Sequence, residues 1–327
     1  MGRQIAAPGR RTIAANEGAS VRNRARAGRR MALNDRIVVG SRESRLAVAQ
    51  SMTLVEHLRR VLPGAEVKLL TMKTTGDRIL DRTLDKVGGK GLFVKELDAA
   101  LRDGRADLTV HSLKDVPMQT PADLPLLGYS RREDPRDVLV LPEGTSALKR
   151  GGVIGTSSLR RAIQLKRLFP ECGIRPVRGN LQTRLKKLDE GQFDAIVLAA
   201  AGMNRMGLSH RASRYFSVDE IIPAAGQGIL GVQGRAGEDH PWLNGYVDGN
   251  ATVAALAERA FVRRLDGGCT SPVCAHAVIS GGQVTLKGLY WDETTDGIAV
   301  GMESGNTVDA EAVGVALAQR LMKEARR

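Results

Sequence analysis

A group of chemically active side chains follows one apolar run in the first half of the chain. Residues 108–110 predict a short buried strand. The polar side chains that follow it are His111, Ser112, Lys114 and Asp115. In open α/β sheets ligands bind outside the carboxyl ends of the strands, so this segment is a candidate site. From the segment alone, the alternative is a solvated loop that carries a Lys–Asp ion pair.

Three strand-to-helix junctions elsewhere in the chain combine hydroxyl groups with arginine. The free N–H groups and the dipole at a helix N-terminus attract anions, and hydroxyls add further donors. Cations are locally unfavourable there, so these arginines predict binding of an external anion, with solvated surface arginines as the alternative. The arginines of the three junctions are Arg42, Arg45, Arg160, Arg161, Arg178 and Arg184.

The number of arginines indicates the kind of ligand. The planar guanidinium group suits bidentate binding of carboxylates or phosphates. Several such sites imply a ligand with several acidic groups. Among these cations Asp115 is the one acid at a strand end, and it is suited to pairing with positive charge that develops on a substrate.

The three cysteines do not indicate a disulfide scaffold, because they are few and odd in number in a long chain. Cys269 follows two glycines, which favours an exposed turn with room for a group on the sulfur. Cys172 is expected in a loop, and Cys274 is expected to precede a strand and to be packed. Cys269 and Cys274 with His276 could suggest zinc, but a second CxxC pair is missing from the sequence, so no metal is predicted.

Alternating strands and helices must position these residues, and this order favours parallel βαβ packing with helices on both faces of each sheet. Strands are predicted at 36–40, 67–72, 124–129, 138–141, 153–155, 174–177, 193–200 and 229–232, and helices at 46–62, 93–102, 158–169 and 181–190. The glycine-rich segment 87–93 lacks the Walker spacing, so no nucleotide site is predicted there. The segment is interpreted as a mobile loop or lid, with a phosphate-binding loop as the alternative.

Two connections and a change of pattern divide the chain. The charged link 131–137 is expected to cross from one domain to another, and residues 223–231 resemble a hinge. From about residue 249 the pattern predicts a separate small α+β domain. Its expected elements are helices 252–265 and 310–325 and strands 277–279 and 284–291.

Length and charge set further bounds. A chain of 327 residues suggests two or three domains. Of the net charge of +13, residues 1–30 contribute +7 (eight Arg and one Glu), which leaves +6 for the rest. This first segment is predicted to be a disordered nucleic-acid-binding arm, a targeting peptide, or an extension upstream of a true start at Met31. No apolar run is long enough to span a membrane, so a cytoplasmic protein is expected.

Several motifs match one family from about Arg36 to the C-terminus. They are VGGKGLFVKEL (87–97), VHSLKDVP (110–117), REDPRD (132–137), GTSSLRR (155–161), RGN with TRL (178–180 and 183–185), PAAGQG (223–228) and LDGGC (265–269). Together they resemble the porphobilinogen deaminase (hydroxymethylbilane synthase) family. Residues 1–30 and Cys274 are not part of this pattern.

The resemblance implies an α/β fold of two periplasmic-binding-protein-like α/β domains plus a small C-terminal α+β domain. The expected boundaries are a basic extension at 1–33, domain 1 at 34–131 and 226–246, domain 2 at 136–222, and domain 3 at 249–327.

The resemblance also implies an activity. A dipyrromethane cofactor would be bound covalently to Cys269, and four porphobilinogen molecules would be added stepwise to this primer with release of ammonia. Hydrolysis would then release the linear tetrapyrrole hydroxymethylbilane, for tetrapyrrole and haem biosynthesis. Asp115 would pair with the pyrrole nitrogen and stabilise the cation formed as ammonia leaves. Porphobilinogen carries acetate and propionate groups, which agrees with the number of arginines.

Residues that match the family's cofactor-binding positions follow from the same resemblance. They are Arg42, Ser44, Ser112, Lys114, Asp115, Thr156, Ser157, Ser158, Arg160, Arg161, Arg178, Gly179, Arg184, Arg205 and Cys269. A monomer without nucleic-acid or membrane partners is expected. Two alternatives stay open: a non-catalytic anion-binding module, and a nucleic-acid binder, which the aromatic content of 3% disfavours.

Overall fold

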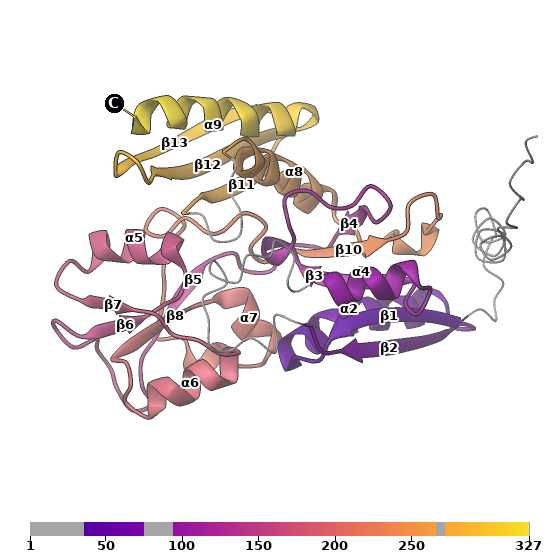
Figure 1. Ribbon diagram of the computed structural model, residues 1–327, viewed down its shortest axis with the longest axis horizontal. Coiled ribbons are helices and arrows are strands. Elements are labelled where there is room, and N and C mark those ends of the chain that lie inside the picture. The colour runs from indigo at the N-terminus through magenta and orange to yellow at the C-terminus, as the bar shows by residue number, and fades with distance from the viewer. Residues whose placement is uncertain (1–35, 75–93, 266–271, 327) are drawn as a thin grey trace, which may run out of the picture.

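The computed structural model describes residues 36–74, 94–265 and 272–326. Two α/β units lie side by side, and a smaller α+β unit lies against both of them (Figure 1). The predicted segments 1–33 and 87–93 and the residue Cys269 lie outside the described residues.

The first α/β unit is built on a five-stranded sheet in the order β2-β1-β3-β10-β4. Strand β1 is parallel to β2 and β3, whereas β10 is antiparallel to β3 and β4. Helix α2 buries Leu54, Val55 and Leu58 against this sheet. The bounds are β1 Arg36–Arg42, α2 Arg45–Val61, β2 Glu66–Met72, α4 Lys95–Arg102, β3 Leu108–Ser112, η1 Leu113–Asp115, β4 Leu126–Tyr129, β10 Leu230–Gly234 and η3 Pro241–Leu243.

The second α/β unit repeats this plan with the order β7-β6-β8-β5-β9. Strand β6 is parallel to β7 and β8, and β5 is antiparallel to β8 and β9. The bounds are β5 Asp137–Val140, β6 Val153–Gly155, α5 Leu159–Leu168, β7 Gly173–Arg175, α6 Leu181–Asp189, β8 Ala195–Ala199, α7 Ala200–Arg205, η2 Ser209–Arg211 and β9 Arg214–Tyr215.

The chain crosses between the two α/β units twice, once from β4 to β5 and once from β9 to β10. The charged link predicted at 131–137 is the first crossing, and the hinge-like segment predicted at 223–231 belongs to the second. The first strand after each crossing, β5 or β10, is antiparallel to its neighbour β8 or β3 in the sheet that it joins. The exact domain boundaries stay a prediction.

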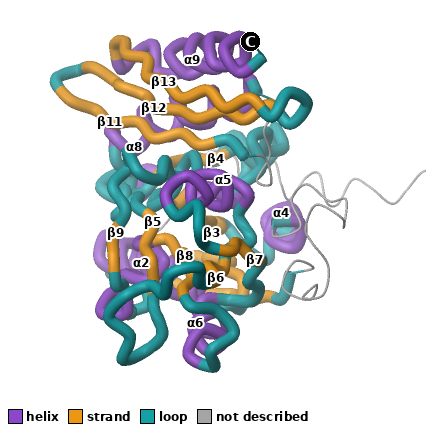
Figure 2. Tube along the Cα trace, turned by 90° about the vertical axis from the view of Figure 1, so that its left-hand side faces the viewer, coloured by secondary structure: helices purple, strands orange, loops and turns teal. Residues whose placement is uncertain are grey.

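The third unit is built on a three-stranded antiparallel sheet (Figure 2). Two helices pack on one face of this sheet. Phe261 of α8 and Leu317 and Leu321 of α9 are fully buried with the sheet residues. At Gly314 an added Cβ would lie 2.3 Å from the Ala257 carbonyl oxygen, so only glycine lets the helices approach so closely. The bounds are α8 Gly249–Arg264, β11 Cys274–Ser280, β12 Gln283–Asp292, β13 Gly297–Asn306, η4 Thr307–Asp309 and α9 Ala310–Ala325.

One buried carboxylate joins all three units. Glu258 on α8 accepts hydrogen bonds from Arg132 in the first crossing, at 2.7 and 2.8 Å. It also accepts from the backbone N–H of Gly226 in the second crossing at 2.6 Å and of Ala277 on β11 at 2.7 Å. The third unit is therefore bound to both crossings at one point.

The predicted fold class is confirmed: two α/β units and a small α+β unit. Some elements differ. The strand predicted at 174–177 ends at Arg175, because Pro176 has no N–H for the ladder. The strand predicted at 193–200 is shorter, since α7 begins at Ala200. Strands β9 and β13 were not predicted. Within the described ranges, no helix combines the length and apolarity needed to cross a membrane.

Candidate functional site

Asp115 and Lys114 lie on the short 3-10 helix η1, directly after β3. Strand β3 continues through Ser112, so it is longer than the 108–110 predicted from sequence. The Asp115 side chain is exposed, whereas Lys114 is half-buried. Burial lowers the pKa of Lys114 to about 8, with Asp115 opposing the shift and Arg161 contributing to it. The strand end therefore presents a solvent-accessible carboxylate beside a partly desolvated ammonium group.

A small pocket lies next to Asp115 in the first unit. Gln50 on α2 donates a hydrogen bond from Nε2 to Ser112 Oγ at 2.7 Å, which fixes the hydroxyl at the pocket wall. Burial lowers the pKa of His111 to about 4, so its imidazole is neutral at physiological pH. The pocket is lined by Arg42, Ala47, Gln50, Val94, Val110, His111, Ser112 and Asp115. The predicted residues Arg42, Ser112 and Asp115 thus meet at one place.

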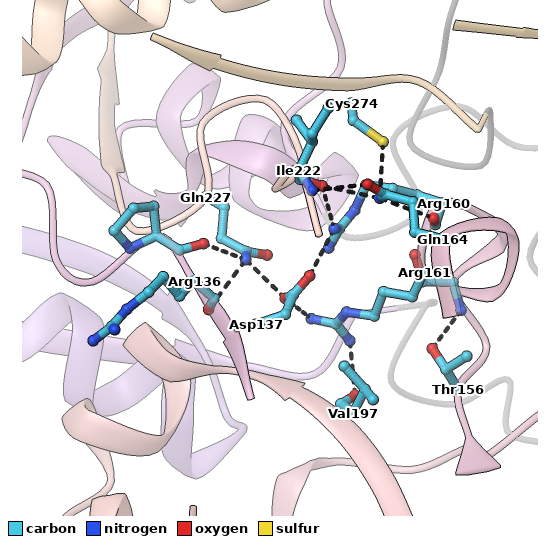
Figure 3. Close-up of polar contacts among 12 residues, drawn as sticks. Arg136, Asp137, Thr156, Arg160, Arg161, Gln164, Val197, Ile222, Gln227 and Cys274 are labelled. Atoms are coloured by element: carbon cyan, nitrogen blue, oxygen red, sulfur yellow. Dashed lines mark hydrogen bonds and ion pairs between the residues drawn. The ribbon is translucent and has the colours of Figure 1, made fainter. Parts of the chain in front are cut away.

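Asp137, the first residue of β5, binds two of the predicted arginines (Figure 3). Arg160 Nη1 donates to Asp137 Oδ2 and Arg161 Nη2 donates to Asp137 Oδ1, both at 2.7 Å. All three side chains are buried. Although burial favours the neutral acid, Arg160 and Arg161 hold the pKa of Asp137 far below its usual range. One carboxylate therefore faces two guanidinium groups, and a charge of +1 is left over.

The junction before α6 places two more arginines near this group. Asn180 Oδ1 accepts a hydrogen bond from Thr183 N and caps the helix. Gly179 has φ +109°, and its carbonyl oxygen accepts from Arg184 Nε at 2.8 Å. Burial, together with Arg161 and Arg178, lowers the pKa of Arg184 to about 10, while Asp115 opposes the shift. Asp115 of the first unit is thus electrostatically coupled to α6 of the second.

The remaining predicted residues have structural contacts of their own. Ser44 Oγ caps α2 by accepting from Ala47 N, and Ser157 Oγ donates to the Val177 carbonyl at 2.6 Å. Thr156 Oγ1 accepts from the N–H of Ser158, the residue that precedes α5.

Arg205 on α7 binds the Gly228 carbonyl in the second crossing at 2.6 Å. Burial lowers the pKa of Arg205, and the shift is opposed by Glu133 and Tyr246, neither of which belongs to the group around Asp115. The described contacts therefore place Arg205 in the hinge region.

Three polar residues of this region were missed at the sequence level: Gln50, Asp137 and Gln227. Asp137 looked like one charge in a charged link, and Gln227 like part of a hinge. A signal was present for Asp137, because an acid at the first position of an apolar strand requires a buried partner.

Comparison with known proteins decides the family. The family described as "Porphobilinogen deaminase, dipyromethane cofactor binding domain" matches residues 37–241, and "Porphobilinogen deaminase, C-terminal domain" matches residues 252–323. The chain belongs to the porphobilinogen deaminase family. It is 52% identical to a porphobilinogen deaminase of Ruminiclostridium josui over 88% of this chain and 97% of that protein. Another, from Burkholderia thailandensis, is 48% identical over 89% and 91%.

Two solved structures resemble the chain at low identity. The periplasmic sulfonate-binding protein SsuA of Methylobacillus flagellatus aligns over 70% of this chain and 68% of that chain, with 15% identity and a TM-score of 0.36. The BenM effector binding domain aligns over 72% and 95%, with 12% identity and a TM-score of 0.38. Likenesses as distant as these have no bearing on the function of the chain.

The residues of the site fit an acidic cofactor such as a dipyrromethane with carboxylate side chains. The cations outnumber the acids where Asp115, Asp137 and the arginines of α5 and α6 meet. Arg161 Nε is buried without a hydrogen-bond partner among the described residues, so a donor is left over. A buried donor without a partner is costly, and an external carboxylate would satisfy it.

Proposed function

We propose that this protein is a hydroxymethylbilane synthase. It condenses four porphobilinogen molecules, releases ammonia at each addition, and releases the linear tetrapyrrole by hydrolysis. The observation that supports this most directly is the exposed carboxylate of Asp115 among buried and half-buried cations from two units. Such a site suits a substrate that carries several carboxylates and develops positive charge as it reacts.

Asp115 is proposed to act on the substrate. Its carboxylate pairs with the pyrrole N–H and stabilises the positive charge that forms when the ammonia leaves. A fixed negative charge in a site rich in cations has an effect larger than in water. Lys114 lies beside Asp115 on η1. It binds a carboxylate, whereas Asp115 pairs with the pyrrole N–H, so the two side chains do not compete for one group.

The other residues are proposed to bind carboxylates of cofactor and substrate. When bound, the dipyrromethane supplies the free α-carbon to which pyrrole rings are added. The arginines give bidentate contacts and the hydroxyl groups add single hydrogen bonds. These residues are Arg42, Ser44, Ser112, Thr156, Ser157, Ser158, Arg160, Arg161, Arg178, Gly179, Arg184 and Arg205.

Cys269 is the proposed attachment point of the cofactor. It lies outside the described residues, five positions before Cys274. Cys274 Sγ accepts a hydrogen bond from Gln164 Nε2 at 3.4 Å, and Gln164 in turn binds the Arg160 carbonyl. The segment that follows Cys269 in the chain therefore contacts α5 at Cys274.

Cys274 itself is an unsuitable attachment point. It is fully buried, and burial raises the pKa of its thiol to about 12. A thiol that stays protonated is a poor nucleophile.

We also propose that the protein works as a cytoplasmic monomer, without nucleic-acid or membrane partners. Arg160, Arg161 and Arg184 of the described site bind Asp137 and the backbone rather than adding to an exposed basic stripe. A nucleic-acid binder would present such a stripe to solvent.

Intact mass tests the proposal. The purified protein should be heavier than its sequence by one dipyrromethane and should react with an acidic aldehyde reagent for free α-pyrrole positions. Cys269→Ser should lose both properties, whereas the matched changes Cys172→Ser and Cys274→Ser should keep them. An active wild-type protein of unmodified mass would contradict the assignment, and so would an adduct retained in Cys269→Ser.

A further inference from the structure

Gln227 lies at the second crossing and contacts charged groups of both α/β units. It is buried, with 1% of its surface exposed to solvent. Its Oε1 accepts a hydrogen bond from Lys114 Nζ at 3.2 Å. Its Nε2 donates to Asp137 Oδ1 at 2.9 Å and to the Pro135 carbonyl at 2.6 Å. One amide group therefore connects Lys114 of the first unit with Asp137 of the second.

The backbone on both sides of Gln227 is held in place. Gly226 and Gly228 have φ values of +73° and +88°, which side chains with a Cβ rarely adopt. A Cβ at Gly228 would lie 2.3 Å from the Glu133 carbonyl oxygen. Gly226 N donates to Glu258 at 2.6 Å, and the Gly228 carbonyl accepts from Glu133 N at 3.1 Å. The direction of the Gln227 side chain is therefore set by contacts before and after it.

The chemistry of its neighbours permits one orientation of the amide. The Pro135 carbonyl and the ionised Asp137 only accept hydrogen bonds, and the Lys114 ammonium only donates. A flipped amide would place oxygen against two acceptors and NH₂ against an ammonium group. Gln227 thus presents an acceptor to the first unit and a donor to the second.

Lys114 needs such an acceptor because its surroundings disfavour its charge. Burial and the two arginines of α5 act against the ammonium form, while two carboxylates support it. Among the described residues, the charged groups that face Lys114 include Asp115 from η1, Asp137 from β5, and Arg160 and Arg161 from α5.

We propose that Gln227 is a positioning residue that holds the Lys114 ammonium group beside Asp115 and keeps it charged. It contacts neither the substrate nor the reacting atoms in this role. The importance of Lys114 for carboxylate binding rests on the proposed function, but the connection between Gln227 and Lys114 does not.

The test measures the ionisation of Lys114 directly. Short pulses of acetic anhydride at pH 6 to 10 modify only the neutral amine, and peptide mass spectrometry gives the extent at Lys114. In Gln227→Met and Gln227→Leu the labelling midpoint should fall by about one pH unit, the size expected for losing one hydrogen bond to a charged group. From a wild-type midpoint of about 8, labelling at pH 7 then rises about fivefold.

Gln233→Leu is the matched control. Gln233 is another buried glutamine, on β10, and binds the Leu124 carbonyl and His111 rather than Lys114. Its loss should lower stability without moving the Lys114 midpoint. Circular dichroism identifies the folded variants, and two substitutions at position 227 guard against one that fails to fold.

An unchanged or raised midpoint in a folded variant at position 227 would overturn the proposal, as would an equal fall in Gln233→Leu. The labelling needs neither substrate nor turnover, and intact mass of the same samples reports on the dipyrromethane. A failure of this inference is thereby distinguished from a failure of the proposed function.

Discussion

The carboxylate of Asp137 is predicted to be the counterion on which the second α/β unit depends. Replacing it by asparagine keeps the size of the side chain but leaves Arg160 and Arg161 buried without a negative partner. Removing one member of a buried ion pair costs about 3–5 kcal/mol. Here two cations lose the same partner, so Asp137→Asn should lie at the upper end of that range.

Hydrogen exchange of the amides in β5 and β8 provides the assay, because these strands pair at Asp137 itself. A loss of 3–5 kcal/mol corresponds to at least about a hundredfold faster exchange. Asp134→Asn is the matched control in the same crossing. Its partner Arg136 is 43% exposed, and a pair of this kind contributes about 1 kcal/mol or less.

The dependence of the stability of the fold on pH follows from the direction in which the pKa of Asp137 is shifted. The arginines lower the pKa of Asp137 in the folded protein, against the effect of burial, so the carboxylate stabilises the fold fully above its unfolded pKa of about 3.9. This contribution is lost as pH falls from about 3.9 toward the folded pKa. The wild type and Asp137→Asn should thus differ by a constant amount from pH 5 to 8. Equal exchange in Asp137→Asn and Asp134→Asn would refute the reasoning.

Three further predictions concern the site and the hinge. Asp115→Asn should stay folded and lose about 10²–10³ in the rate of ammonia release, measured in a single turnover after the adduct is confirmed by mass; release near the wild-type rate would remove Asp115 from the mechanism. Arg178→Leu should stall elongation or weaken cofactor assembly, seen by mass spectrometry of enzyme intermediates, whereas Arg150→Leu, in an exposed pair with Glu171, should not. Gly228→Ala should lower the melting temperature much more than Gly104→Ala, because both have positive φ but only position 228 lacks room for a Cβ. Similar losses at the two glycines would contradict the close approach at Glu133.

The parts of the fold that were predicted from sequence are those with strong local signals. Strands β1, β3 and β8 are short runs of buried apolar residues, and α2 has apolar residues at helical spacing after a serine cap. Strand β13 has glycine and serine at several positions and many exposed side chains, so its local pattern is weak. It exists because β12 pairs with it over its whole length.

The residues proposed to bind the ligand could be predicted from sequence, but the hydrogen bonds and ion pairs among them could not. The sequence places Arg160 and Arg161 at a helix start, where an external anion is the natural partner. In the structure they also have an internal partner, Asp137, which is 23 and 24 positions away. The roles of Gln227 and Glu258 depend on segments about 90 to 130 residues apart coming together, and no local pattern contains that information.

The position of β10 has a consequence for synthesis on the ribosome. This strand lies between β3 and β4, although it follows β4 by 101 residues, from Tyr129 to Leu230. At a translation speed of about 5–20 residues per second, β10 is synthesised roughly 5–20 s after β4. During this interval the edges of β3 and β4 that pair with β10 have no partner strand. The second unit, by contrast, has all five of its described strands between Asp137 and Tyr215. The α/β unit that is begun first is therefore completed after the second α/β unit. A nascent chain that stops before β10 leaves two strand edges open to association with other chains.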